Sequence, residues 1–287
     1  MTEQAPADQR CYRHRDREAY ISCQRCGRKI CPDCLRDASV GFHCPESVAE
    51  GAKTVRTART VFGGTVSARE GIASMVIIGM NVAAFVVTLA LGGSTGKFFE
   101  NGAMLSITVG DPVGNILKGV ADGGYWRLLT SAFLHEGVLH IAFNMYALYL
   151  FGPMVERALG IRRFVGSYLT IAIGASVFVY WLAAPNALTI GASGAVFGLF
   201  AMALIFLVKA KQDVTSLLVM LALNAVISLQ GNISWQGHLG GFLIGLGLGA
   251  TFAYAPRERR TQVQILVFVA LWIGIIAAVV LRTSQLT

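Results

Sequence analysis

Charged residues are scarce in this chain. Asp, Glu, Lys and Arg together make up 14% of its 287 residues, whereas 54% of the residues are hydrophobic. Soluble domains carry about 25% charged residues. The shortage excludes an ordinary soluble globular protein and predicts an all-α polytopic membrane protein with enough spans for one compact bundle. The chain also contains no internal repeat and no low-complexity tract.

Cysteine is absent beyond residue 44. Paired C-x2-C units with interspersed histidines are more typical of zinc sites in a reducing compartment than of a disulfide framework or a flexible tail with incidental cysteines. A region this short and polar would take its folding energy from the metal. Eight candidate ligands match two tetrahedral zinc ions, and they are Cys11, His14, Cys23, Cys26, Cys31, Cys34, His43 and Cys44.

We also expect no cleavable signal peptide, because the N-terminal region is hydrophilic and rich in cysteine. We expect a zinc-binding module over residues 1–50 and a basic linker over residues 51–70. Seven apolar spans then follow, with a long loop between the first and the second. The spans cover Ile72–Leu91, Gly137–Val155, Phe164–Ala184, Ser193–Val208, Thr215–Leu229, Trp235–Tyr254 and Val263–Leu281.

Basic residues are few in alternate gaps between the spans. None lies between the third and fourth spans or between the fifth and sixth, whereas half of the 24 Lys and Arg residues precede Gly71. The net charge of +8 therefore reflects topology signals and not a nucleic-acid-binding face. We expect a plasma-membrane protein with a cytoplasmic N-terminus, an extracellular C-terminus, the lipid bilayer as its environment and no nucleic-acid partner.

Four polar side chains nevertheless lie in the first turns of apolar spans. His140 and Asn144 belong to the second span, Ser193 opens the fourth and His238 lies near the start of the sixth. Ionisable residues within spans are costly, which by default suggests a functional site. Because these spans run in the same direction, all four side chains lie at about the same depth below the outer surface. A transporter or proton channel would need polar groups deeper in the spans.

Glycines recur every fourth residue beside two of these positions. Small residues at this spacing let helix backbones approach closely in lipid. If the two glycine rows face each other, Ser193 and His238 come within hydrogen-bond reach. The rows are Gly194 and Gly198 in the fourth span and Gly237, Gly241, Gly245 and Gly249 in the sixth.

The fourth to sixth spans contain no Asp or Glu. A Ser-His-Asp triad is therefore disfavoured, and the simpler reading is a dyad in which His238 removes the proton of the Ser193 hydroxyl. His140, Asn144 and the backbone N–H of Ser193 are candidates to stabilise an oxyanion. Phe197, one turn below Ser193, can stack on the imidazole of His238. Each of these residues alone also has a structural explanation. A serine in an apolar helix, for example, commonly bonds to its own backbone.

Together these motifs resemble the rhomboid intramembrane serine proteases. The resemblance covers about residues 71–255 and implies a six-helix core, to which residues 256–287 add a seventh helix. It implies cleavage of transmembrane segments of other proteins near the outer face, without a cofactor for catalysis. The motifs that carry it are Trp126-Arg127, His135-x4-His140-x3-Asn144, Gly191-Ala192-Ser193-Gly194 and His238-x2-Gly241-x3-Gly245.

The resemblance also implies a role for each motif residue. Ser193 would be the nucleophile and His238 the base, with His140 and Asn144 in the oxyanion hole. Many family members carry Tyr at the position of Phe197, a change that preserves stacking. The alternative function is a catalytically inactive relative that binds or escorts membrane proteins, which loss of Ser193 or His238 would have indicated. Residues expected to support the site are His135, Gly191, Phe197, Trp126 and Arg127.

The N-terminal region resembles the B-box-like zinc finger that precedes some bacterial rhomboids. The resemblance implies two structural zinc ions and a protein partner for the module. The family pattern ends in C-P-x-C, whereas this chain has Ser47 at the last position, which leaves His43 as the substitute ligand. In a cross-brace, one zinc would be held by Cys11, His14, Cys31 and Cys34, and the other by Cys23, Cys26, His43 and Cys44.

Overall fold

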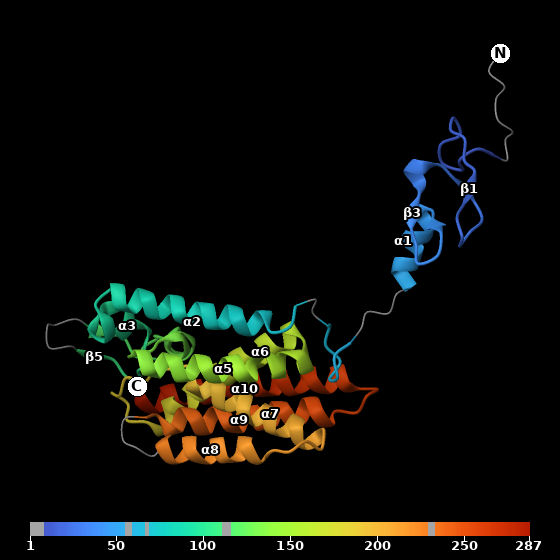
Figure 1. The fold of residues 1–287 in the computed structure, drawn as a ribbon. Helices are drawn as coiled ribbons and strands as arrows, with labels where there is room; N and C mark the ends of the chain where they lie inside the picture. The colour runs from blue at the N-terminus through green and yellow to red at the C-terminus, as the bar shows by residue number, and fades with distance from the viewer. Residues whose placement is uncertain (1–8, 55–58, 67–68, 111–115, 229–232) are drawn as a thin grey trace. The chain divides into compact units, whose positions relative to one another are not determined.

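The computed structural model describes residues 9–54, 59–66, 69–110, 116–228 and 233–287. The chain divides into two compact units, Met1–Thr57 and Ala58–Thr287 (Figure 1). Their boundary falls within the linker expected over residues 51–70. Parts of that linker and of the 1–50 module, and Leu229 at the expected end of the fifth span, lie outside the described residues.

The core of the N-terminal unit is built largely from cysteine. Among its described residues, seven buried hydrophobic ones form this core; five are cysteines, and the others are Ala19 and Ile30. Such a core buries too little apolar surface to stabilise a fold by itself. The unit contains the antiparallel pairs β1 (Ile21–Ser22) with β2 (Lys29–Ile30) and β3 (Arg36–Asp37) with β4 (Phe42–His43), the 3-10 helix η2 (Pro32–Cys34) and α1 (Pro45–Thr54).

The second unit is a bundle of long helices, one for each of the apolar segments. In the described part of the chain, four helices are long and apolar enough to cross a bilayer, namely α2, α5, α6 and α10, and α7 and α8 are apolar but shorter. The protein is therefore an all-α polytopic membrane protein. The bounds are α2 (Ile72–Ala90), α5 (Val138–Leu159), α6 (Ile161–Leu182), α7 (Ser193–Lys209), α8 (Thr215–Ser228), α9 (Trp235–Tyr254) and α10 (Arg260–Leu286).

Several helix ends lie beyond the apolar segments that predicted them. α5 continues through Arg157 to Leu159, and α6 begins at Ile161, because Gly160, at a φ of 79°, separates the two helices. α10 extends past Val263–Leu281 on both sides. Long polar side chains at helix ends reach toward water while their backbone stays helical. Hydropathy alone therefore underestimates the length of these helices.

The buried carboxylate of Glu156 joins the start of α2 to α5. It accepts hydrogen bonds from the backbone N–H groups of Ala73 at 3.1 Å and Ser74 at 2.9 Å, and from the Ser74 hydroxyl at 2.8 Å. The first N–H groups of a helix lack partners within the helix, and a negative charge is favoured beside them. This contact fixes where α2 enters the bundle.

The two glycine rows bring α7 and α9 into close contact. An ideal Cβ on Gly241 would lie 1.8 Å from the carbonyl oxygen of Gly194, and one on Gly245 would lie 2.3 Å from that of Gly198. α9 packs chiefly against α7 and α6. The backbones of α7 and α9 can approach this closely only because glycine occupies these positions.

α8 buries few of its side chains. Its only buried described residues are Leu217 near its start and Ser228 at its end. Figure 1 shows α8 at one edge of the bundle and α2 at the opposite edge. Apart from Leu217 and Ser228, the described side chains of α8 are partly or fully exposed.

The segment between α2 and α5 has its own structure around Arg127. The Arg127 side chain is fully buried and donates hydrogen bonds to the carbonyls of Lys118 at 2.6 Å, Glu100 at 2.6 Å and Ala103. Its guanidinium thereby joins separate turns of this segment. The elements are η3 (Gly93–Thr95), α3 (Lys97–Gly102), β5 (Val109–Gly110) paired with β6 (Ile116–Leu117), α4 (Arg127–Thr130) and η4 (Ser131–Phe133).

Candidate functional site

Ser193 is the first residue of α7 and follows a turn that depends on glycine. Gly191 has a φ of 120°, which other residues rarely adopt. Its N–H donates to the carbonyl of Ser131 at 2.9 Å. An ideal Cβ on Gly191 would lie 2.8 Å from Nε2 of His140 and 3.6 Å from Oγ of Ser193. The imidazole of His140 and the hydroxyl of Ser193 therefore flank the same glycine.

The structure brings Ser193 and His238 together. Nε2 of His238 lies 2.7 Å from Oγ of Ser193. The close approach of Gly194 and Gly241, one residue beyond Ser193 and three beyond His238, allows this distance. A hydrogen bond between hydroxyl and imidazole is the arrangement by which a general base activates a serine.

Phe197 stacks on the His238 ring, as its position one turn below Ser193 led us to expect. The ring centroids are 4.2 Å apart and the planes differ by 10°. Only 9% of His238 is exposed. The stacked ring of Phe197 and the hydroxyl of Ser193 at Nε2 therefore restrict the orientation of the His238 imidazole.

A third contact of His238 has no counterpart in the sequence-based expectations. Oγ of Ser228, the last residue of α8, lies 2.6 Å from Nδ1 of His238. Ser228 also donates to the carbonyl of Asn224 at 2.6 Å. One serine in an apolar segment carries no sequence signal that separates it from a serine bonded only to its own helix.

His140 and Asn144 lie on α5, on the same helix face. The side-chain amide of Asn144 donates one hydrogen bond to the carbonyl of His140 at 2.9 Å. An amide group has two N–H donors, so the second remains for another acceptor. The first backbone N–H groups of α7 likewise lack partners within their helix. These groups are the donors that an oxyanion near Ser193 could use.

His135 contacts His140, whereas Trp126 and Arg127 are hydrogen-bonded within the segment between α2 and α5. His135, in the loop before α5, is fully buried and packs edge-on against the His140 ring with centroids 4.9 Å apart. Burial, together with His140, lowers the pKa of His135 to about 4, so its ring is neutral at physiological pH. The indole N–H of Trp126 donates to the Asn101 carbonyl at 2.9 Å.

A small cavity of about 30 Å³ lies beside Ser193. Its lining includes the side chains of Ser131, Ser176 and Ser193. Ser131 and Ser176 lie 3.4 Å apart, oxygen to oxygen. A polar cavity of this size has room for about one water molecule.

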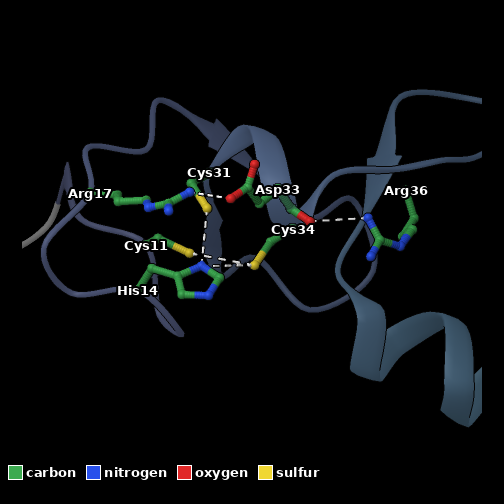
Figure 2. A network of polar contacts seen from close by, with 7 residues as sticks. All are labelled: Cys11, His14, Arg17, Cys31, Asp33, Cys34 and Arg36. Atoms are coloured by element: carbon green, nitrogen blue, oxygen red, sulfur yellow. Dashed lines mark hydrogen bonds and ion pairs between the residues drawn. The ribbon is translucent and has the colours of Figure 1, made fainter.

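The first metal-ligand group of the N-terminal unit matches the expected set. The ligand atoms of Cys11, His14, Cys31 and Cys34 all lie within 4.8 Å of one another. Figure 2 shows the His14 ring between the thiols, with Nδ1 3.3 Å from Sγ of Cys31 and 3.4 Å from Sγ of Cys34. The thiols are free and form no disulfide. Zinc bonds of about 2.3 Å in a tetrahedron need ligand spacings of this order.

The thiol pKa values in this group indicate a site suited to a cation. Burial opposes ionisation of Cys11, but hydrogen bonds from backbone N–H groups outweigh it and lower its pKa to about 6. Burial and the neighbouring thiols Cys11 and Cys31 raise the pKa of Cys34 to about 11. Several thiolates at this spacing repel one another unless a positive ion lies between them.

The second group differs from expectation at its fourth position. Cys23, Cys26 and Cys44 come together, but His43 does not join them and lies instead in β4. Ser47 takes that place, with Oγ 3.4 Å from Sγ of Cys23 and 3.2 Å from Sγ of Cys44. Ser47 lies in the first turn of α1, so the helix carries its side chain toward the thiols while the β4 pairing holds the backbone of His43.

Comparison with known proteins agrees with the geometry. A Rhomboid domain family model matches residues 122–255. The chain is 34% identical to "Putative rhomboid protease YdcA" of Bacillus subtilis over 60% of this chain and 89% of that protein. It is 29% identical to "Rhomboid protease AarA" of Providencia stuartii over 51% of this chain and 62% of that protein. It is 34% identical to "Rhomboid protease GluP" of Bacillus subtilis over 53% of this chain and 31% of that protein.

The family model covers α7 and α9, the helices that carry Ser193 and His238, and leaves the cysteine-rich unit outside. It therefore includes the helices α5 to α9 and their polar cluster, and it does not extend to the N-terminal metal-ligand groups. The chain belongs to the rhomboid family.

Proposed function

We propose that this protein is an intramembrane serine endopeptidase that cleaves transmembrane segments of other membrane proteins. The observation that carries the proposal is the 2.7 Å contact between Oγ of Ser193 and Nε2 of His238. The rhomboid proteases among its relatives support the same chemistry. An escort function without catalysis is not favoured, because a nucleophile and a base in hydrogen-bond contact have no role in it.

The proposed reaction follows from the contacts around Ser193. As Oγ bonds to the carbonyl carbon of the scissile peptide, its proton passes to Nε2 of His238. His140, Asn144 and the Ser193 N–H stabilise the resulting oxyanion. The imidazolium then gives its proton to the leaving amine, the C–N bond breaks, and an acyl ester remains on Ser193.

Hydrolysis of that ester requires water inside an apolar bundle. The polar cavity beside Ser193 has a volume suited to about one water molecule. The water oxygen attacks the ester carbonyl carbon while His238 takes a proton from the water. The ester bond to Oγ of Ser193 then breaks, and His238 returns the proton to Oγ. The two half-reactions thus use the same base in both directions.

We place the cleavage site near the outer face of the plasma membrane. The support is the distribution of basic residues, which favours a cytoplasmic N-terminus and an extracellular C-terminus. Ser193 begins α7 and His238 lies in the first turn of α9, whereas Lys209 ends α7. The proposed catalytic end of α7 is therefore opposite to the end marked by Lys209, and Arg257 follows the opposite end of α9.

The N-terminal unit is proposed to bind two structural zinc ions and to contact a protein partner. Four donors fit the first ion, and Cys23, Cys26 and Cys44 with the hydroxyl of Ser47 fit the second. Zinc would supply the folding energy that a core of cysteines lacks. No step of the proposed cleavage involves these ions.

The test is cleavage of a fluorogenic transmembrane substrate by the full-length protein in liposomes. We expect Ser193→Ala and His238→Ala to lose at least about 1,000-fold in rate, as removal of a nucleophile or base generally does. A fluorophosphonate probe should label the unsubstituted protein and not the Ser193→Ala variant. Equal cleavage by the protein and by Ser193→Ala would overturn the proposal.

A further inference from the structure

The base has a second polar partner besides the nucleophile. Nε2 of His238 faces Ser193 at 2.7 Å, and Nδ1 faces Ser228 at 2.6 Å. Within the described residues, the hydrogen-bond partners of this imidazole are thus two serine hydroxyls, and neither is a carboxylate. The three side chains come from three helices, α7, α8 and α9.

The number of protons on His238 and Ser228 determines which group donates and which accepts in each contact. A neutral imidazole carries one N–H, and Nε2 must lack it in order to accept the proton of Ser193. The N–H must then be at Nδ1 and needs an acceptor. Ser228 has one hydroxyl proton, which it donates to the carbonyl of Asn224 at 2.6 Å. Its oxygen lone pairs are therefore available to Nδ1–H.

We propose that Ser228 is a positioning residue that holds His238 in the tautomer required for catalysis. The inference rests on the proposed protease function. The carbonyl of Asn224 orients the Ser228 hydroxyl, the hydroxyl accepts Nδ1–H, and Nε2 is left free for Ser193. When His238 takes the proton of Ser193, the same acceptor stabilises the imidazolium. Ser228 does for His238 what a carboxylate does in a catalytic triad, without a charge in an apolar bundle.

Burial supports this role for Ser228. Only 5% of Ser228 is exposed, although the described residues of α8 are otherwise accessible except for Leu217. A bond to its own helix already satisfies the hydroxyl proton of a serine in an apolar segment. Burial of the lone pairs is costly unless they too find a partner, and Nδ1–H of His238 is that partner.

The experiment compares variants of the full-length protein in liposomes with a fluorogenic transmembrane substrate. We expect Ser228→Ala to lower kcat about tenfold with KM unchanged within about twofold, because one neutral hydrogen bond is lost. Ser228→Thr retains the hydroxyl and should restore kcat to within about threefold. Ser216→Ala is the matched control, since Ser216 lies on α8 and is exposed.

A second readout measures the tautomer itself. In protein labelled with 15N-histidine at mildly alkaline pH, the signal of His238, identified by its loss in His238→Gln, should report a proton at Nδ1. In Ser228→Ala we expect this signal to shift toward the Nε2–H form, which a purely structural role of Ser228 would not cause. Unchanged kcat and an unchanged tautomer in Ser228→Ala would overturn the inference.

The two proposals fail in different ways. If Ser193→Ala cleaves as well as the unsubstituted protein, the protease proposal is wrong, whereas the NMR signal still decides whether Ser228 fixes the tautomer. If cleavage depends on Ser193 but Ser228→Ala retains full kcat with an Nδ1–H signal, only the role of Ser228 is wrong. The role of Ser228 would also be wrong if Ser228→Thr lowered kcat as much as Ser228→Ala and the tautomer of His238 were unchanged in both variants.

Discussion

One backbone position sets the geometry around Ser193. Gly191 combines a φ of 120° with an approach to His140 that leaves no room for a side chain. Any other residue would strain the turn that presents Ser193 and would push the His140 ring away. The positions of Ser193 and of His140, the proposed oxyanion donor, therefore depend on a residue without a Cβ atom.

Substitution of Gly191 by Ala is expected to reduce kcat/KM by at least about tenfold, since a strained backbone of this kind costs about 1–3 kcal/mol. Gly137→Ala serves as the control, because Gly137 is extended and a Cβ there meets nothing within 4 Å. Cleavage assays on both variants check the prediction. An unimpaired Gly191→Ala enzyme would contradict it.

Some residues of the candidate sites could not be predicted from the sequence. The spacing of cysteines indicated two ligand groups, and the resemblance to a B-box-like zinc finger implied His43 in the second group, where the structure places Ser47. Spacing counts residues along the chain, whereas the β4 pairing and the first turn of α1 decide which side chain faces the thiols. Ser228 was missed for a related reason, because its partner His238 lies on another helix.

The change Ser47→Cys should complete a set of four thiolates around the second zinc ion. A thiolate is a stronger zinc ligand than a neutral hydroxyl, so we expect the second ion to bind at least about tenfold more tightly. Competition with a chromogenic chelator measures this affinity. Ser39→Cys adds an exposed thiol to the same unit and should leave both affinities unchanged; an equal gain there would refute the assignment.

At the level of elements, the pairing of α7 with α9 was the most successful expectation. Glycines at every fourth position predicted a close approach, and the structure shows Gly241 against Gly194 and Gly245 against Gly198. Helix positions were predictable from hydropathy, whereas helix ends such as Leu159 and Leu286 were not. The roles of Ser193 and His238 remain predictions, although their contact is present.

Gly241→Ala is expected to separate α7 from α9, because its Cβ would lie 1.8 Å from a backbone oxygen. Overpacking of this kind costs about 1–3 kcal/mol, and a longer distance between Ser193 and His238 should lower the cleavage rate. Gly247→Ala, also on α9, meets nothing within 4 Å and is the matched control. Thermal unfolding and cleavage rates measured on both variants should differ clearly; equal behaviour would contradict the close-packing argument.

For the molecule as a whole, two units of different physical character share one chain. The bundle is stabilised by helix packing, and the N-terminal unit has cysteines where other domains have apolar side chains. The family model covers part of the bundle only. Loss of metal should therefore affect one unit without unfolding the other.

Removal of zinc with a strong chelator is expected to abolish hydrogen-exchange protection over residues 9–54 while α7 and α9 keep theirs, because the metal supplies folding energy only to the N-terminal unit. Added zinc should restore the lost protection. Loss of protection in α7 or α9 on chelation would show that the units are coupled.

The order of the helices along the chain has a consequence for biosynthesis. Ser193 precedes His238 by 45 residues, and the helix that ends in Ser228 lies between them. A growing chain therefore carries the proposed nucleophile first, then the residue proposed to orient the base, and the proposed base last. Under the proposed mechanism, the Ser193 hydroxyl stays unactivated until α9 packs against α7, so the nascent polypeptide would not cleave neighbouring membrane proteins.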